Sequence, residues 1–371
     1  MTPSQKHTRP AEQPHVIVLG AGYAGLLAAL RLAPHARVTL IDPSDRFTER
    51  VRLHELAARR PDVGHPLTRL LRGTGIRHIA RRATGLDPAA RRVTTDDGRI
   101  HDWDRLVYAL GSRTPETAGE HVHTAESAAG LGKRLRGTTG TLAVVGGGLT
   151  GIEMAAELAE THTGWRVRLL SSGQVAAGHS ARGRAHVRRV LAARGVSVEE
   201  GERVTSPDAV DADAVLWSAA MVPNTALAAD AGLTLDPRTH RIAVDENLRS
   251  LSHPEILAAG DSAAAHSPLA GSLRMGCAAA LPTGSHAAAV IAAESLERTP
   301  KPLGFRYSLQ CVSLGRHDGL IQFVNPDDTP RDRILTGRPA ALVKEQIVRA
   351  TVHTLRLARS RPGALSLLPG L

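Results

Sequence analysis

Two glycine-rich segments contain the residues of this sequence that are best suited to bind phosphate. The first reads GAGYAG over residues 20–25, and the second reads GGGLTG over residues 146–151. In a GxGxxG segment the first glycine permits a tight turn, the second lets the backbone approach a pyrophosphate, and the third lets a helix pack closely on a strand. The N-terminus of the following helix then faces the phosphate charge. Both segments therefore predict a dinucleotide-binding turn.

The residues around the first segment supply the elements that such a turn requires. Residues 15–19 are apolar and predict a buried strand, residues 26–32 predict a helix, and residues 37–41 predict a second strand that ends at Asp42. An acid at this position accepts hydrogen bonds from ribose hydroxyls. The complete order of strand, turn, helix, strand and acid is far more specific than a lone GxGxxG segment.

The second segment has a similar context. A strand is predicted over residues 141–145, a helix over 152–158, and a further strand over 165–170, which is followed by Ser171 and Ser172. One such unit is typical of a simple dehydrogenase. Two units in one chain indicate that electrons pass between two nucleotides, one held tightly and one exchanging.

The composition excludes several classes of protein. The chain has 371 residues, 42% of them hydrophobic, which is enough for two or three domains with cores of their own. Its net charge of +10 comes almost entirely from arginine and fits a compositional habit of the source, anionic cofactors, a membrane surface or nucleic acid. With only three Phe, three Tyr and three Trp, the chain lacks stacking platforms, and we expect no nucleic-acid partner.

The sequence also bears on the compartment. The two cysteines are far apart, the N-terminal residues lack an apolar core, and no run of eighteen apolar residues occurs. These features predict a cytoplasmic protein without a signal peptide, a disulfide or a membrane span. The histidines lack partners at metal-binding spacing, so we infer no metal site.

Two further segments narrow the class. Residues 104–112 predict a strand that ends in a small-residue turn, and residues 249–261 predict a strand that ends at Gly260 and Asp261. With the two glycine segments, these four ordered motifs resemble the FAD-dependent pyridine nucleotide oxidoreductases with two dinucleotide-binding domains, most closely their type II NADH dehydrogenase-like branch. The resemblance extends over roughly residues 16–293.

The resemblance implies an α/β protein with two Rossmann-like domains and a small C-terminal α+β part. The FAD domain is expected to be split over residues 14–113 and 246–300, with the NAD(P) domain inserted at residues 114–245. Residues 1–13 are expected to form a disordered tail, and residues 301–371 the C-terminal part.

The family's motifs also assign the cofactor contacts. The residues expected to bind FAD are Gly20, Ala21, Gly22, Tyr23, Ala24, Gly25, Asp42, Arg52, Ala83, Ala109, Gly111, Gly260, Asp261 and Ala278. The residues expected to bind NAD(P)H are Gly146, Gly148, Leu149, Thr150, Gly151, Ser171, Ser172, Ala219 and Ala220.

Two residues are candidates for a catalytic role, because flavin and nicotinamide carry the hydride chemistry and the protein orients them. In the resembled branch the glutamate at Glu153 approaches the nicotinamide, so we assign it to orienting that ring; the alternative is a favourable carboxylate near a helix N-terminus. Cys277 is expected near the flavin, with a small buried hydrophobic residue as the alternative. His54 and Arg52 either face the flavin or lie on a helix surface.

The nucleotide preference depends on Ser171. NADH-preferring relatives carry an acid at this strand end, which binds the ribose and repels a 2′-phosphate. Because Ser171 and Ser172 remove that repulsion and several arginines are near in sequence, we expect NADPH as the donor, with NADH as the alternative.

The electron acceptor is the least defined part. Disulfide reductases carry a CxxxxC or CxxC motif where residues 49–56 lack cysteine, which excludes a dithiol route. Type II dehydrogenases carry an AQxxxQ-like helix at the quinone site, but Ala278 and Pro282 replace both glutamines here. We expect electrons to pass to a quinone or another small acceptor. The alternatives are a reductase of a small redox protein, an enzyme that modifies an aromatic metabolite, and a flavin-based redox sensor.

The C-terminal part offers a possible membrane contact. Residues 313–319 predict a turn between two strands, and residues 340–358 predict an amphipathic helix whose cations include Lys344 and Arg349. Such a helix suits the inner face of a cell membrane; the alternative is a helix packed on the body with its arginines reaching solvent. We expect a monomer or a homodimer.

Overall fold

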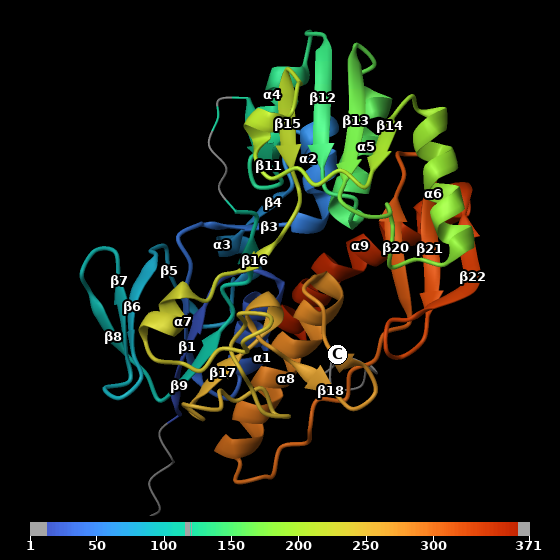
Figure 1. Cartoon of the computed structure of the whole chain (residues 1–371). Coiled ribbons are helices and arrows are strands. Elements are labelled where there is room, and N and C mark those ends of the chain that lie inside the picture. The colour runs from blue at the N-terminus through green and yellow to red at the C-terminus, as the bar shows by residue number, and fades with distance from the viewer. Residues whose placement is uncertain (1–12, 116–118, 120, 363–371) are drawn as a thin grey trace, which may run out of the picture.

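Two parallel sheets organise the chain, as the computed structural model shows for residues 13–115, 119 and 121–362 (Figure 1). Apart from residue 13, the predicted N-terminal tail lies outside the described residues. The first sheet has the strand order β17-β9-β1-β2-β5, and every pair in it is parallel. Its strands are β1 (His15–Leu19), β2 (Arg37–Ile41), β5 (Arg77–Ile79), β9 (Arg105–Tyr108) and β17 (Ile256–Ala258).

Helices α1 (Tyr23–Leu32) and α8 (Cys277–Ser295) pack against each other beside the first sheet. Small residues permit this contact, since a Cβ atom on Gly284 of α8 would overlap the carbonyl oxygen of Ala24 in α1. The strands of the first sheet and both helices share one hydrophobic core. This packing fixes the start of α1, and with it the first glycine turn.

The second sheet has the order β11-β15-β12-β13-β14 and is also fully parallel. Its strands are β11 (Val122–Thr124), β12 (Gly140–Val145), β13 (Trp165–Ser171), β14 (Ser197–Glu200) and β15 (Ala214–Trp217). Its helices are α4 (Ala128–Leu135), α5 (Leu149–Thr161) and α6 (Ala181–Ala193). The two parallel sheets confirm the predicted α/β architecture.

Shorter elements lie in the connections between these strands and helices. The antiparallel ones are β3 (Arg46–Thr48) with β4 (Gly64–Pro66), β6 (Ala83–Asp87) with β7 (Arg92–Thr95) and β8 (Ile100–Asp102), β10 (Ser112–Arg113) with β16 (Val222–Pro223), and β18 (His266–Ser267) with β19 (Gly271–Ser272). The short helices are α2 (Leu53–Ala58), α3 (Leu67–Leu70) and α7 (Ala226–Asp230), with 3₁₀ turns at Arg50–Arg52, Pro207–Ala209 and Gly260–Ser262.

Helix α2 packs on the second unit although it comes from the first part of the chain. Leu53, Ala57 and Ala58 belong to the same hydrophobic core as α4 and α5. The approach to α4 is close, because a Cβ atom on Gly132 would overlap the carbonyl oxygen of Ala57. The predicted domain boundaries stay a prediction, and α2 ties the two units together.

The C-terminal part is a three-stranded antiparallel sheet followed by a long helix. The strands are β20 (Leu309–Ser313), β21 (Gly319–Val324) and β22 (Pro330–Thr336), and the helix is α9 (Gly337–Ser360). The predicted turn at 313–319 and the predicted helix at 340–358 both form at these places. Helix α9 packs on β21 and on α1, and it runs between the two parallel-sheet units (Figure 1). No helix in the described part of the chain is long and apolar enough to cross a membrane.

Candidate dinucleotide and electron-transfer site

The first glycine turn joins β1 to α1, and each glycine in it has a different reason to lack a side chain. Gly20 has a φ of +96°, and a Cβ atom there would lie 2.5 Å from the carbonyl oxygen of Ala109. A Cβ atom on Gly25 would overlap the carbonyl oxygen of Gly20. A Cβ atom on Gly22 would meet no protein atom within 4 Å. The backbone therefore presents an open face at Gly22, where a pyrophosphate needs it.

The second turn, between β12 and α5, repeats this geometry. Gly146 has a φ of +126°, and a Cβ atom on Gly151 would overlap the carbonyl oxygen of Gly146. A Cβ atom on Gly148 would again meet nothing within 4 Å. Gly22 and Gly148 are also the N-cap residues of α1 and α5, and neither helix start has a side-chain cap. Free N–H groups at two helix N-termini are suited to phosphate. The residues of both turns thus fit a dinucleotide.

Asp42 lies directly beside the first turn. Its Oδ2 accepts a hydrogen bond of 2.7 Å from the Ala21 N–H, and its Oδ1 accepts one of 2.8 Å from the Ser44 N–H. Since backbone donors hold the carboxylate at the end of β2, it is placed to accept a further bond from a ribose hydroxyl.

Ser171 occupies the corresponding position in the second unit. The Gly20 N–H donates to the carbonyl oxygen of Ile41, the residue before Asp42, and the Gly146 N–H donates in the same way to Leu170, the residue before Ser171. The Ser171 hydroxyl lies against Gly147. Ser171 is therefore the structural counterpart of Asp42, and the second unit has a serine where the first unit has an acid.

The turn after β17 joins three parts of the first unit through Asp261. Its Oδ2 accepts a hydrogen bond of 2.7 Å from the Ser112 hydroxyl, and its Oδ1 accepts one of 2.7 Å from the Gly276 N–H at the start of α8. Gly260 has a φ of +69°, and its N–H donates to the Thr283 hydroxyl at 2.9 Å. The Gly-Asp pair, the turn after β9 and the N-terminus of α8 thus converge.

With this convergence the two turns and the Gly-Asp pair form one arrangement, and the sequence profile described as pyridine nucleotide-disulphide oxidoreductase matches residues 14–289. The chain belongs to the pyridine nucleotide-disulphide oxidoreductase family. It is an oxidoreductase, and its cofactors are FAD and a nicotinamide dinucleotide.

Relatives of this oxidoreductase include enzymes with related names. An NADH dehydrogenase-like protein of Mycobacterium tuberculosis is 28% identical over 90% of this chain and 92% of its own length. The alternative NAD(P)H-ubiquinone oxidoreductase C1 of Arabidopsis thaliana is 27% identical over 84% of this chain and 73% of its own. The structure of NDH2 from Plasmodium falciparum in complex with NADH covers 97% of this chain and 99% of its own, at 14% identity and a TM-score of 0.77, and shows the shared fold. The resemblance to the type II NADH dehydrogenase-like branch is confirmed.

Glu153 of the oxidoreductase lies where four elements meet. Its Oε1 accepts hydrogen bonds from the Lys344 ammonium on α9 and, at 2.9 Å, from the Ser313 N–H at the end of β20. Its Oε2 lies 3.7 Å from Nδ1 of His54 on α2. The Glu153 and Lys344 side chains are 13% and 11% exposed. Glu153, Lys344, His54 and Ser313, which we call the Glu153 cluster, connect α5 to α9, α2 and β20.

The charges of the Glu153 cluster support one another. Burial alone raises the pKa of Glu153, but the Lys344 ammonium and the Ser313 N–H outweigh it, so this pKa lies below its usual value. Burial alone lowers the pKa of Lys344, and the Glu153 carboxylate raises it above its usual value. Burial is the main cause that lowers the pKa of His54. At neutral pH the cluster contains an ion pair beside a neutral imidazole.

Both cysteines are free and partly buried. Cys277 is the first residue of α8, and the carbonyl oxygen of Cys311 on β20 accepts from the Lys344 ammonium at 3.4 Å. Burial raises the pKa of both thiols. Since a thiolate is the reactive form, these thiols are weak nucleophiles near neutral pH. The catalytic role of Cys277 stays a prediction.

The remaining expected contacts are spread around the two turns. Leu149 and Thr150 form the first turn of α5, and Ala219 and Ala220 follow β15, where the Ala219 N–H lies close to Gly146. Those of the first unit are Ala109 and Gly111 just after β9, Ala83 on β6, and Ala278, which is exposed in the first turn of α8. Their contacts with cofactors stay predictions.

Arg52 and Lys344 lie in surroundings that the sequence did not indicate. The Arg52 guanidinium is 5% exposed and pairs with the carboxylates of Glu49, Glu55 and Glu345, so neither it nor the buried His54 lies on a helix surface. Lys344, expected among the exposed cations of the last helix, is buried against Glu153. Its only sequence signal is that it is one of four lysines in a chain rich in arginine.

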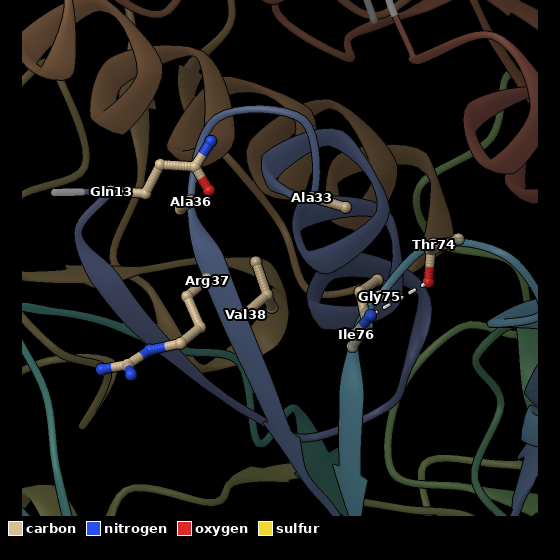
Figure 2. A pocket seen from close by; sticks show the side chains of 8 residues that line it. All are labelled: Gln13, Ala33, Ala36, Arg37, Val38, Thr74, Gly75 and Ile76. Carbon is tan, nitrogen blue, oxygen red and sulfur yellow. Dashed lines mark hydrogen bonds between the residues drawn. The ribbon is translucent and has the colours of Figure 1, made fainter. Parts of the chain in front are cut away.

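The hollow in Figure 2 is not the dinucleotide site. It has a volume of about 390 Å³ and lies beside the start of β2, at Arg37 and Val38, and the residues before β5, from Thr74 to Ile76 (Figure 2). Strands β2 and β5 are parallel, so this is the amino end of both. Dinucleotides bind outside the carboxyl ends of parallel strands, where Asp42 and the glycine turn lie.

Proposed function

We propose that this oxidoreductase is an NAD(P)H:quinone oxidoreductase. FAD, which the first glycine turn and the Gly260-Asp261 turn would hold, would supply the redox chemistry between NAD(P)H and the acceptor. The protein's own residues bind both dinucleotides at the two glycine turns and exclude water around the buried Glu153 cluster. The observation that carries the proposal is the position of Glu153, which follows the second glycine turn on α5 and is fixed by residues from α2, β20 and α9.

Electrons leave to an acceptor outside the chain in this proposal. The only two cysteines are separate, free thiols on α8 and β20, with raised pKa values. Relatives named as a demethylphylloquinone reductase and as an NAD(P)H-ubiquinone oxidoreductase act on quinones by their names. A quinone is therefore the acceptor class that we propose, although Ala278 and Pro282 stand where type II enzymes carry glutamines.

Glu153 is proposed to position the nicotinamide. The carboxylate stays ionised because Lys344 pairs with it, so it is a fixed hydrogen-bond acceptor near the end of α5 that faces the second turn. Glu153→Gln keeps the shape and removes the charge. We expect it to slow flavin reduction by NAD(P)H about tenfold, while FAD content is unchanged.

An acceptor screen with the purified FAD-loaded protein tests the proposal. NADH and NADPH are mixed with a soluble benzoquinone, a soluble naphthoquinone, ferricyanide and ferredoxin under anaerobic conditions. Rapid flavin bleaching followed by quinone-dependent reoxidation is the expected result. Flavin that is bleached but reoxidised only by ferredoxin would overturn the quinone assignment, and flavin that NAD(P)H does not bleach would overturn the enzyme itself in favour of a sensor.

We also propose that α9 attaches the protein to an anionic membrane surface. Leu342 and Val343 are 66% and 39% exposed on this helix, and Arg338, Arg349 and Arg356 are exposed along it. The opposite face packs on β21 and α1. Exposed apolar side chains among arginines suit the boundary between anionic head groups and acyl chains.

A further inference from the structure

The strand next to Ser171 carries an acid that the first unit lacks. Ser171 on β13 pairs with Glu200 on β14, each the last residue of its strand. In the first unit the corresponding neighbour of Asp42 is the residue after Ile79, which is Ala80. The second unit therefore has its carboxylate one strand further along the same edge of the sheet.

Glu200 is fixed to the loop that covers the second glycine turn. Its Oε1 accepts a hydrogen bond of 2.6 Å from the Val175 N–H. Val175 is fully buried, its side chain packs against Gly147, and the Ala176 N–H donates to the carbonyl oxygen of Gly147 at 3.1 Å. The carboxylate is thus attached, through one residue, to the turn that faces the pyrophosphate.

Arg188 on α6 donates to both oxygens of Glu200, at 2.7 Å each. These bonds and the Val175 N–H lower the pKa of Glu200, so the group is ionised at neutral pH. A carboxylate offers about four acceptor positions, so Oε2, whose described partner is Arg188, can accept a further hydrogen bond. Arg188 is meanwhile engaged and unavailable to a phosphate.

A hollow of about 630 Å³ begins at this edge of the sheet. Its lining includes the apolar residues Leu170, Val204 and Val210, the acids Glu199, Glu200, Glu202 and Asp211, and the cations Arg168 and Arg203. Arg168, which also lines it, is neutralised by Glu199 through bonds of 2.7 and 2.8 Å. With four acids against two arginines the lining has a net negative charge, which suits an adenosine with free ribose hydroxyls and disfavours an added 2′-phosphate dianion.

We propose that Glu200 determines the nucleotide specificity, by accepting a hydrogen bond from the adenosine ribose and by engaging Arg188, so that the protein takes NADH in preference to NADPH. This reverses the expectation drawn from Ser171, because the register of β13 and β14 supplies the missing acid from the neighbouring strand. The inference rests on the proposed function only in that NAD(P)H is the electron donor.

Direct binding tests this specificity without any acceptor. Calorimetric titration of the oxidised FAD-loaded protein with NAD⁺ and with NADP⁺ is expected to give at least about tenfold tighter binding of NAD⁺. Glu200→Gln is expected to narrow that ratio by about tenfold, since it removes the negative charge and releases Arg188. Asp208→Asn, which removes an exposed carboxylate of the same unit, is the matched control and is expected to leave the ratio unchanged. A wild-type preference for NADP⁺, or an unchanged ratio in Glu200→Gln, would overturn the inference.

A second variant gives the opposite shift. Arg188→Ala removes the guanidinium that pairs with Glu200 and is expected to widen the preference for NAD⁺. The double variant Glu200→Gln, Arg188→Ala is expected to bind NADP⁺ more weakly than Glu200→Gln alone, because Arg188 is no longer there to contact the 2′-phosphate. Tighter NADP⁺ binding by Arg188→Ala would contradict the assignment. If NAD⁺ binds preferentially but no quinone is reduced, the acceptor assignment fails and the role of Glu200 stands.

Discussion

Lys344 of the last helix and Glu153 of the second dinucleotide unit form a buried ion pair, although 191 residues separate them in the chain. This pair connects the C-terminal part to the residue that we assign to the nicotinamide. The C-terminal sheet contributes as well, since the Ser313 N–H completes the contacts of the carboxylate at 2.9 Å. The last part of the chain is therefore a component of the site and not an appended module.

Removing one partner of this ion pair should destabilise the protein strongly. Lys344→Met leaves the Glu153 carboxylate buried without its cation, which costs on the order of 3–5 kcal/mol of unfolding free energy. Adding Glu153→Gln to the same chain removes the unpaired charge, so the double variant should lose less than the two single variants together. Urea denaturation of the four proteins measures the coupling, and Lys301→Met, at an exposed lysine, is the control. Strictly additive losses would contradict the ion pair.

The glycines of the two turns should separate folding from cofactor binding. Gly25→Ala is expected to prevent folding, because its Cβ would overlap the carbonyl oxygen of Gly20. The Cβ atoms that Gly22→Ala and Gly148→Ala add would meet no protein atom within 4 Å, so both variants should fold. The first should lose FAD, and the second should keep FAD but bind NAD(P)H at least about tenfold more weakly. Circular dichroism, the flavin absorbance of the purified protein and nucleotide titration measure these outcomes. Full FAD content in Gly22→Ala would exclude this turn as the FAD pyrophosphate site.

His286 on α8 should make stability fall in mild acid. Burial lowers the pKa of His286 from its usual 6.5 to about 4, so the unfolded chain binds a proton that the folded protein does not. The contribution of His286 to the free energy of unfolding is therefore fully present above pH 6.5. It decreases as the pH falls towards 4, by up to about 3 kcal/mol. Denaturation at pH 7.5 and pH 5 should show a smaller loss for His286→Gln than for the wild type. His317→Gln, at an exposed histidine, is the control and should lose as much stability between pH 7.5 and pH 5 as the wild type. A loss in His286→Gln as large as that in His317→Gln would refute the assignment.

The sequence predicted what depends on neighbours along the chain. The strands at residues 15–19 and 37–41 and both glycine turns form at the predicted places. Their hydrophobic pattern is local, and Gly25 and Gly151 are each required by a carbonyl oxygen five residues earlier in the same turn. The helix at 340–358 was also predictable from its periodicity. Nothing local marked Lys344 as buried, since its partner belongs to another element.

The position of Glu200 illustrates the same limit in the sheet. The sequence shows Ser171 without an acid, and only the register of β13 with β14 shows that a carboxylate ends the next strand. The placement of α2 on the second unit is a further case, because its core residues Leu53 and Ala57 are apolar in either environment. Relations between strands and between units depend on tertiary packing, which a local pattern does not contain.

Helix α9 should bind anionic membranes through its exposed face. Leu342 and Val343 supply a small apolar surface, and Arg338, Arg349 and Arg356 supply charge, so the interaction should depend strongly on salt. We expect the protein to float with vesicles that contain anionic phospholipid at low ionic strength, and to remain unbound with neutral vesicles or in about 1 M salt, where the Debye length is about 3 Å. Replacing both apolar residues by serine should weaken flotation without changing FAD content, because their side chains face solvent. Flotation that is equal for both vesicle types, or absent with anionic vesicles at low salt, would rule out this surface as a membrane contact.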